Sequence, residues 1–457
     1  MVFSTVEFLF IFLPVAYGAF RLAGGGKPPL IVASVTYLAL FGARGFASTA
    51  LFCLLGYSVL KFYAARPASR AAFWTAISFN VAYLFIFKYF QDGVPCLKDF
   101  APVGVSYFTF KAISAVVDAG YKKIDATSMG FLDYLFYLVY FPSLVAGPIA
   151  RFRDLAPPAP SPAKGFFNDD LAEGFYLFMK GMVCKVLIAD PAYGYFASRS
   201  SDFTAISAPN CALTIFAYSI FIYYDFLGYN FMALGASAMF GVKLPSNFNS
   251  PYLKRNIIEF WNSWHMTLSF WLRDYVFNPL GQALLRRKFF RERGLLTSTI
   301  CYLFTFTLCG AWHGATAGFI AWGIYHGVMQ SSYKIMQSLE KKAGLNQRAG
   351  YQDFFAKTGF AITFVFVSFG WIFFMFDSPA ESLAFAGRLS AFSVPFDPKG
   401  LSAIARPLFL AIFLFYEDRR VNKNRFEDAA AKFAMAVIAL NCILSLSNAR
   451  AFLYGGF

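Results

Sequence analysis

The sequence predicts an all-helical protein that crosses a membrane many times, and three observations support this fold class. Hydrophobic residues make up 58% of the 457 residues and charged residues only 14%, whereas a soluble domain carries about 25% charged residues. Apolar stretches near the ~20 residues that span a bilayer recur along the chain. The basic residues cluster in short segments between these stretches. We therefore expect roughly 11–12 membrane-embedded helices in a single domain over residues 1–457, and no nucleic-acid binding despite the net charge of +15.

The apolar stretches run from one end of the chain to the other. They cover residues 6–22, 29–43, 45–63, 72–90, 129–149, 171–191, 210–240, 295–312, 315–337, 358–376, 403–416 and 431–447. Several are too short for an upright span, so we expect re-entrant segments or helices covered by neighbours. The first stretch lacks a basic leader and a cleavage site, and we interpret it as a retained anchor.

The basic segments predict an orientation. The richest lie at residues 286–293, 341–357 and 419–425. Two apolar stretches separate each from the next, so all three can face one side, which the positive-inside rule assigns to the cytoplasm. The turn at residues 312–314 then lies toward the outer end of its helices.

All three histidines lie between residues 260 and 327, namely His265, His313 and His326. Imidazole is well suited to proton transfer near neutral pH, so this region is a candidate site. Residues 257–276 show helical spacing of apolar residues but carry too many polar residues for a lipid-exposed span. We expect one helix there, lying along or dipping into the membrane and lining a cavity.

Several motifs in this region are familiar. Residues 247–252 (NFNSPY), 260–275 (FWNSWHMTLSFWLRDY) and 312–314 (WHG) closely resemble the membrane-bound O-acyltransferase (MBOAT) family, in its bacterial branch that acylates cell-envelope polymers. Residues 102–110 and 141–148 resemble alginate O-acetyltransferases. Residues 225–229, 241–243 and 265–270 are more similar to the teichoic-acid D-alanyl transfer protein. The resemblance extends from Met1 to about Phe376, with the motif-bearing core at about 100–376.

The resemblance implies helices that enclose a funnel or tunnel through the membrane. The invariant histidine of the family falls on His313, the expected general base, and a second catalytic histidine falls on His265. The candidates for the substrate channel are Trp312, Trp264, Asn249, Asp225 and Tyr229, of which Asp225 is a candidate because an ionisable group is costly in an apolar stretch. In one departure, Ser263 stands where the family often has Arg.

The histidines and Asp225 each have more than one possible role. His265 could orient the substrate, bind an oxyanion or relay a proton, whereas His326 is expected to be structural, ~20 Å from His313 if one helix carries both. Asp225, in an apolar stretch, is either a functional group or the partner of a neighbouring Lys or Arg. Cys309 and His313 share a helical face, but no further ligands complete a zinc site, so we expect no metal.

We therefore expect an enzyme, an O-acyltransferase of the bacterial cytoplasmic (inner) membrane. It would take an acyl group from a cytosolic thioester, either acetyl-CoA or an acyl or aminoacyl carrier protein, with no tightly bound cofactor. The acceptor would be a hydroxyl of an exported polymer or of a secreted or membrane-anchored partner protein. A transporter or flippase that uses buried His and Asp, and a non-catalytic scaffold of an acylation complex, are the alternatives. The sequence leaves open the acyl group, the polymer and the oligomeric state.

Overall fold

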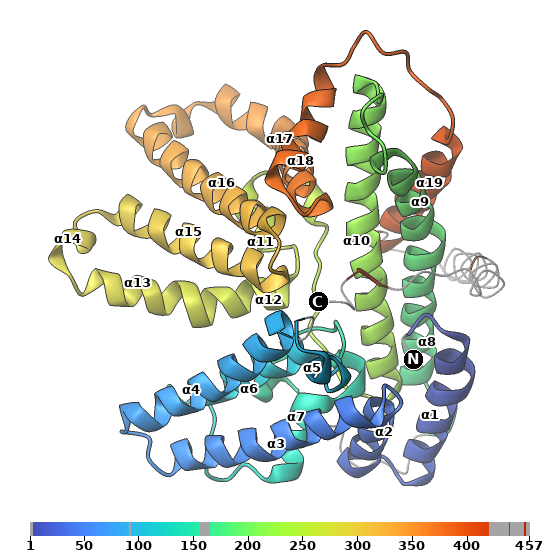
Figure 1. Ribbon diagram of the computed structural model, residues 1–457, viewed down its shortest axis with the longest axis vertical. Helices are drawn as coiled ribbons and strands as arrows, with labels where there is room; N and C mark the ends of the chain where they lie inside the picture. The colour runs from blue at the N-terminus through green and yellow to red at the C-terminus, as the bar shows by residue number, and fades with distance from the viewer. Residues whose placement is uncertain (1–2, 91–92, 156–164, 420–437, 439–451, 454–457) are drawn as a thin grey trace. The chain divides into compact units, whose positions relative to one another are not determined.

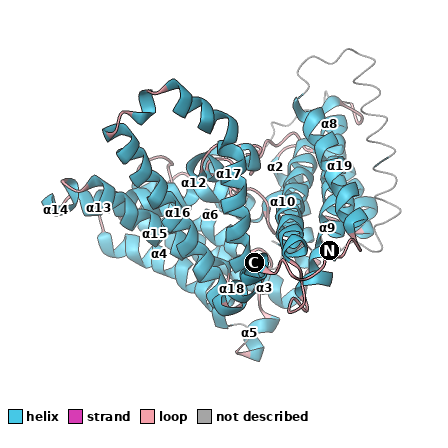
Figure 2. Cartoon of the chain, turned by 90° about the horizontal axis from the view of Figure 1, so that it is seen from above, coloured by secondary structure: helices cyan, strands magenta, loops and turns pink. Residues whose placement is uncertain are grey.

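The computed structural model describes residues 3–90, 93–155, 165–419, 438 and 452–453 (Figure 1). Within these residues every regular element is helical, as Figure 2 shows. In the described part of the chain, five helices are long and apolar enough to cross a membrane: α3 (Ala43–Ala64), α4 with its continuation (Arg70–Phe90), α10 (Ala208–Met239), α15 (Gly294–His313) and α17 (Ala349–Met375). The chain is thus an all-α, multi-pass membrane protein, as the composition predicted.

The contacts divide the chain into two compact units. The first comprises Met1–Asp190, Tyr224–Ser246 and Leu408–Phe457. Besides α3, α4 and the second half of α10, its helices are α1 (Leu13–Leu22), α2 (Lys27–Ala39), α5 (Pro95–Asp99), α6 (Val105–Gly120), α7 (Phe131–Val139), α8 (Asp169–Met182) and most of α19 (Leu401–Arg419).

Glycines bring α8 and α10 into close contact within the first unit. Gly174 lies against Gly235, and Gly181 lies against Gly228, so each helix contributes two glycines seven residues apart. A Cβ atom on Gly181 would come within 2.6 Å of the Gly228 carbonyl oxygen. Small residues at such a spacing let helix backbones approach closely in membrane proteins.

The second unit comprises Pro191–Tyr223 and Asn247–Pro407. Besides the first half of α10, α15 and α17, its helices are α9 (Asp190–Ser200), α11 (Ile257–Trp261), α12 (Met266–Leu272), α13 (Asn278–Leu285), α14 (Lys288–Arg291), α16 (Ala317–Lys342) and α18 (Pro379–Gly387). The helices α15 and α16 form a tight hairpin, in which Gly310 and Gly323 leave no room for side chains between the backbones.

Three expectations about elements need correction. Residues 257–276 do not form one helix, because α11 ends at Trp261 and α12 begins at Met266. The stretch 129–149 ends its helix at Val139, since Pro142 follows in a separate turn. The helix α6 was missed as an element of its own, although its side chains are almost all buried. The expected helix at 431–447 and most of the basic segment 419–425 lie outside the described residues.

Candidate active site

His313 is the last residue of α15 and lies in the aromatic core of the second unit. Its side chain is 3% exposed. The imidazole centroid is 4.5 Å from the ring of Trp312, 5.2 Å from that of Trp322 and 4.9 Å from that of Phe374. The helix stops here because Gly314 takes an extended conformation (φ 174°). The sequence Trp-His-Gly therefore places an imidazole at a helix end inside an apolar wall.

His265 lies in the break between α11 and α12, and its backbone explains that break. It has φ 42° and ψ 51°, a left-handed conformation that is uncommon for a residue other than glycine. The segment before α11 holds it there, because the Met266 N–H donates to the Asn247 carbonyl at 2.9 Å. The Asn249 N–H likewise donates to the Ser263 carbonyl at 3.0 Å. Such backbone outliers cluster at functional sites.

The contacts of Asn247 define the tautomer of His265. The Asn247 Oδ1 atom accepts hydrogen bonds from the backbone N–H (3.3 Å) and the hydroxyl (2.6 Å) of Thr267, which fixes the orientation of the amide. The same oxygen lies 3.4 Å from the Nδ1 atom of His265. Because this oxygen is an acceptor, Nδ1 is the donor, and Nε2 of the neutral ring carries a lone pair.

Burial keeps His265 neutral. The side chain is 1% exposed, and neither α11 nor α12 is among the described helices that are long and apolar enough to cross a membrane. This burial lowers the pKa of His265 to about 3, because the charged form would lose its hydration. A neutral ring with its Nε2 lone pair accepts hydrogen bonds, whereas an oxyanion requires a donor. The tautomer and the low pKa therefore favour orientation of the substrate among the three roles of His265.

Two tryptophans connect the histidines. The Trp312 ring contacts His313 and also lies 6.5 Å from His265. The Trp322 ring lies 5.2 Å from His313 and 4.9 Å from His326. The separation of ~20 Å was expected only if one helix carried His313 and His326. That condition does not hold, because the chain turns at Gly314 and two separate helices carry the two histidines.

His326 has a structural partner. The Trp261 indole N–H donates to its Nδ1 atom at 3.2 Å, and the imidazole is fully buried. This bond joins α11 to α16, so it supports the segment that leads to His265. Sequence reasoning did not single out Asn247 and Trp322, and only their places inside or near the motifs could have indicated them.

The remaining channel candidates in this unit lie in different surroundings. Trp264 is fully buried, with ring contacts to Phe260, Trp371, Tyr252, Tyr223 and Phe248. It therefore packs the core of the unit. The side chain of Asn249 is exposed, and its backbone supports the His265 loop. Ser263 is a buried residue in that loop.

Asp225 and Tyr229 belong to the first unit. The Lys185 Nζ atom lies 2.7 Å from the Oδ1 atom of Asp225 and 2.9 Å from Asp190. The Leu453 N–H donates to Oδ2 of Asp225 at 2.9 Å. Asp225 thus has the lysine partner that the sequence left open. Tyr229 accepts a hydrogen bond from the Ala146 N–H at 3.2 Å, which ties α10 to the turn after α7.

Comparison with known proteins decides the family. The model of the membrane-bound O-acyltransferase family matches residues 51–376. The chain belongs to this family. It is therefore an O-acyltransferase, as the motifs around His265 and His313 predicted. No cluster of three or more His, Cys, Asp or Glu side chains that could hold a metal occurs within the described residues.

Its similarity to individual MBOAT proteins covers most of the chain. A probable alginate O-acetylase of Pseudomonas fluorescens is 32% identical over an alignment of 418 residues that covers 89% of this chain and 78% of that protein. A peptidoglycan O-acetyltransferase of Helicobacter pylori is 30% identical over 82% of this chain and 77% of that protein. A teichoic acid D-alanyltransferase of Bacillus subtilis is 30% identical over 60% of this chain and 68% of that protein.

Proposed function

We propose that this MBOAT protein transfers a short acyl group from a cytosolic thioester to a hydroxyl of an exported cell-envelope polysaccharide, or to a relay protein that serves it. Acetyl is the favoured group, because the similarity to O-acetylating relatives covers 82–89% of the chain and that to the D-alanyltransferase 60%. The single observation that carries the proposal is His313, buried at a helix end in the motif of an acyltransferase family.

In this mechanism His313 accepts and returns the proton of the acceptor hydroxyl. His313 takes the proton of the acceptor hydroxyl while the hydroxyl oxygen attacks the thioester carbonyl carbon. The new C–O bond forms, the C–S bond breaks, and the leaving thiolate takes the proton back from the imidazolium. General base catalysis of this kind contributes about 10²–10⁴-fold. His265, with the lone pair on Nε2, orients the hydroxyl, and the Trp312 ring lies between the two imidazoles.

The two substrates reach the site from opposite sides in this proposal. The basic segments at 286–293 and 341–357 support a cytosolic location for one end of α15, α16 and α17. His313, at the other end of α15, then faces the outside. A funnel from the outside and a narrow channel from the cytosol would let the acyl group cross alone. The protein would lie in the cytoplasmic membrane and work with a secreted or membrane-anchored acceptor partner, and with a carrier protein if the donor is one.

The test is the ester content of the cell envelope. Cells carrying His313→Ala are expected to lose the base-labile ester at membrane expression equal to wild type, and mild base should release acetate from wild-type envelopes. His326→Asn is the matched control, because the Asn Oδ1 atom can still accept the Trp261 indole N–H, and it should retain most of the ester. Normal acylation by His313→Ala would overturn the general-base role and favour a scaffold. Release of D-alanine would replace acetyl in the proposal.

A further inference from the structure

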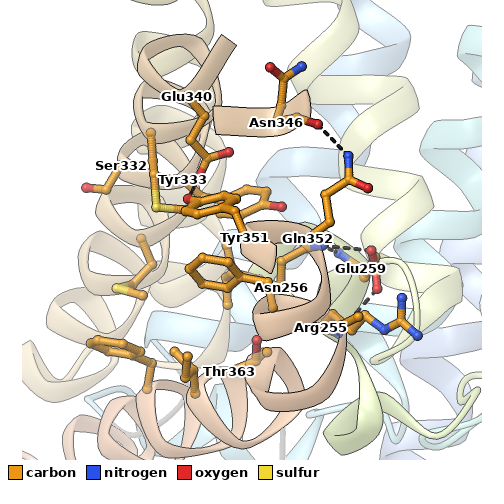
Figure 3. A pocket seen from close by; sticks show the side chains of 18 residues that line it. Arg255, Asn256, Glu259, Ser332, Tyr333, Glu340, Asn346, Tyr351, Gln352 and Thr363 are labelled. Atoms are coloured by element: carbon orange, nitrogen blue, oxygen red, sulfur yellow. Dashed lines mark hydrogen bonds between the residues drawn. The ribbon is translucent and has the colours of Figure 1, made fainter. Parts of the chain in front are cut away.

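The second unit contains a crevice that the acyltransferase mechanism does not use. It has a volume of about 630 Å³ and lies between α16 and α17, with the start of α11 at one side (Figure 3). This volume is within the range of small-molecule sites, about 300–1,000 Å³. The α16 wall contributes Met329, Tyr333, Met336 and Glu340, which recur at helical spacing and so share one face.

The lining changes in polarity from one end of the crevice to the other. At the end nearest the loop between α16 and α17, the wall is polar and includes Glu340, Asn346 and Gln352. Toward the opposite end the lining includes the apolar Met329, Ile362 and Phe366 together with Thr363. Figure 3 labels Glu340 and Asn346 at one end and Thr363 at the other, with Arg255, Asn256 and Glu259 along the α11 side. The apolar surface for a lipid chain is thus the part of the wall that α16 and α17 form.

The length of the crevice matches one leaflet of a bilayer. The α17 wall extends from Tyr351 to Phe366, which at about 1.5 Å per residue is ~22 Å. A bilayer with its headgroups is ~40–45 Å thick, so half of it is ~20–22 Å. Phe366 is 47% exposed and Met336 is 36% exposed. These apolar walls therefore open to the surroundings of the unit, where a lipid chain can enter from the side.

The polar end carries positive charge. The loop from residue 341 to residue 350 contains Lys341, Lys342 and Arg348 and no acidic residue. All three side chains are exposed. The long helix α17 also starts here, and no side chain caps it within the described part of the chain. A helix N-terminus and three cations favour an anion.

The two carboxylates of the wall are already engaged. The Tyr351 hydroxyl donates to Glu340. The Asn256 side chain donates to Glu259 at 2.7 Å, and the Arg255 N–H donates to the same carboxylate at 3.3 Å. Glu340 thereby joins α16 to α17, whereas the bonds of Glu259 stay within the start of α11. The three cations of the loop outnumber the single carboxylate, Glu340, that directly precedes them in the chain.

We propose that this crevice binds one anionic phospholipid of the cytoplasmic leaflet. Its headgroup phosphate lies at the loop with Lys341, Lys342 and Arg348, and its acyl chain lies between α16 and α17 along Met336 and Phe366. The leaflet follows from the basic loop, which the positive-inside rule places in the cytoplasm. The lipid would fix the distance between the two helices.

The test uses the full-length protein, purified in detergent and stripped of lipid, with phosphatidylglycerol and phosphatidylcholine of identical chains as probes. Native mass spectrometry and the thermal unfolding midpoint report binding. We expect one phosphatidylglycerol per chain, bound at least tenfold more tightly than phosphatidylcholine, with a rise of the midpoint. Replacing Lys341, Lys342 and Arg348 together by Gln should weaken the binding of phosphatidylglycerol about a hundredfold, because each basic residue contributes about fivefold to the affinity.

Two matched controls make the result specific. Replacing Arg286, Arg287 and Arg291 by Gln removes the same charge from another basic segment and should leave binding unchanged. Ala356→Trp fills the crevice and should abolish binding of either lipid, whereas Ala361→Trp, on an exposed face of α17 outside the crevice, should not. Equal binding of the two lipids, equal effects of the two triple variants, or full competition by glycerol phosphate would each overturn the proposal. If Ala356→Trp fails to fold, the two triple variants still test the proposal, because they change exposed side chains only.

Discussion

At the residue scale, the buried charges of the first unit are arranged so that one cation serves two anions. The Lys185 side chain and the Asp225 side chain are both fully buried, and the Asp190 side chain is 13% exposed. Removing one member of a buried ion pair typically costs about 3–5 kcal/mol, because the remaining charge has lost its partner. The cost should therefore depend on which member is removed.

We expect Lys185→Met to destabilise the protein by about 3–5 kcal/mol, since it leaves two carboxylates facing each other in the core. Asp225→Asn should cost less, because Lys185 keeps Asp190. The double variant Lys185→Met with Asp225→Leu should regain much of the loss, since the more accessible Asp190 can stay hydrated. Thermal unfolding in detergent measures all three. A double variant no better than Lys185→Met alone would show that the charges do not account for the loss.

The neutral state of His265 leads to a prediction about pH. Its pKa in the folded protein, about 3, is below the ordinary value of about 6.5. The neutral form is therefore favoured by folding, and the resulting stability is present above pH ~6.5 and lost as the pH falls toward 3. His265 should not titrate in the folded enzyme between pH 5 and 9.

We accordingly expect His265→Asn to lower the rate of acyl transfer about 10²-fold without changing the shape of the pH–rate profile between pH 5 and 9. Initial rates with an acyl thioester and a soluble acceptor, in detergent, measure both. The disappearance of one limb of the profile in the variant would mean that His265 titrates in this range, contrary to its burial.

At the scale of elements, the sequence predicted the long helices well and the short ones poorly. The helices α10, α15 and α17 follow from apolar stretches whose hydrophobicity exceeds any competing signal. The break between α11 and α12 at residues 262–265 could not be predicted from the sequence, because the helical spacing of apolar residues in 257–276 continues through it. The contacts that impose it come from Asn247, which is distant in sequence. Asn247 belongs to the recognised motif at residues 247–252, but its contact with His265 could not be predicted from the sequence, and Trp322 was not singled out.

The packing of α8 on α10 provides a prediction at this scale. Gly181→Ala should destabilise the protein by about 1–3 kcal/mol, because the new methyl group meets the backbone of Gly228 and Met232. Gly194→Ala, on α9, is the control. No atom lies within 4 Å of its added Cβ, and alanine raises helix propensity by up to ~1 kcal/mol. Thermal unfolding in detergent should move in opposite directions for the two variants; movement in the same direction would show that the close contact is unimportant.

At the scale of the whole molecule, the proposed reaction requires the two ends of α15, α16 and α17 to face different compartments. The helices alternate in direction: α15 ends at His313, α16 ends at Lys342 and α17 ends at Met375. The basic loop after α16 and the turn after α17 therefore lie on opposite sides if these helices cross the membrane. The donor thioester would be met on the first side and the acceptor on the second.

Cysteine labelling tests this orientation. In a background without the seven native cysteines, we expect Glu381→Cys, which follows α17, to react with a membrane-impermeant maleimide in intact cells. Ala343→Cys, in the basic loop, should react only after the membrane is permeabilised. Both positions are exposed in the second unit, so burial does not explain a difference between them. The reverse pattern would place His313 toward the cytosol, and the acceptor hydroxyl would then have to be cytosolic, because the base that activates it lies at that end of α15.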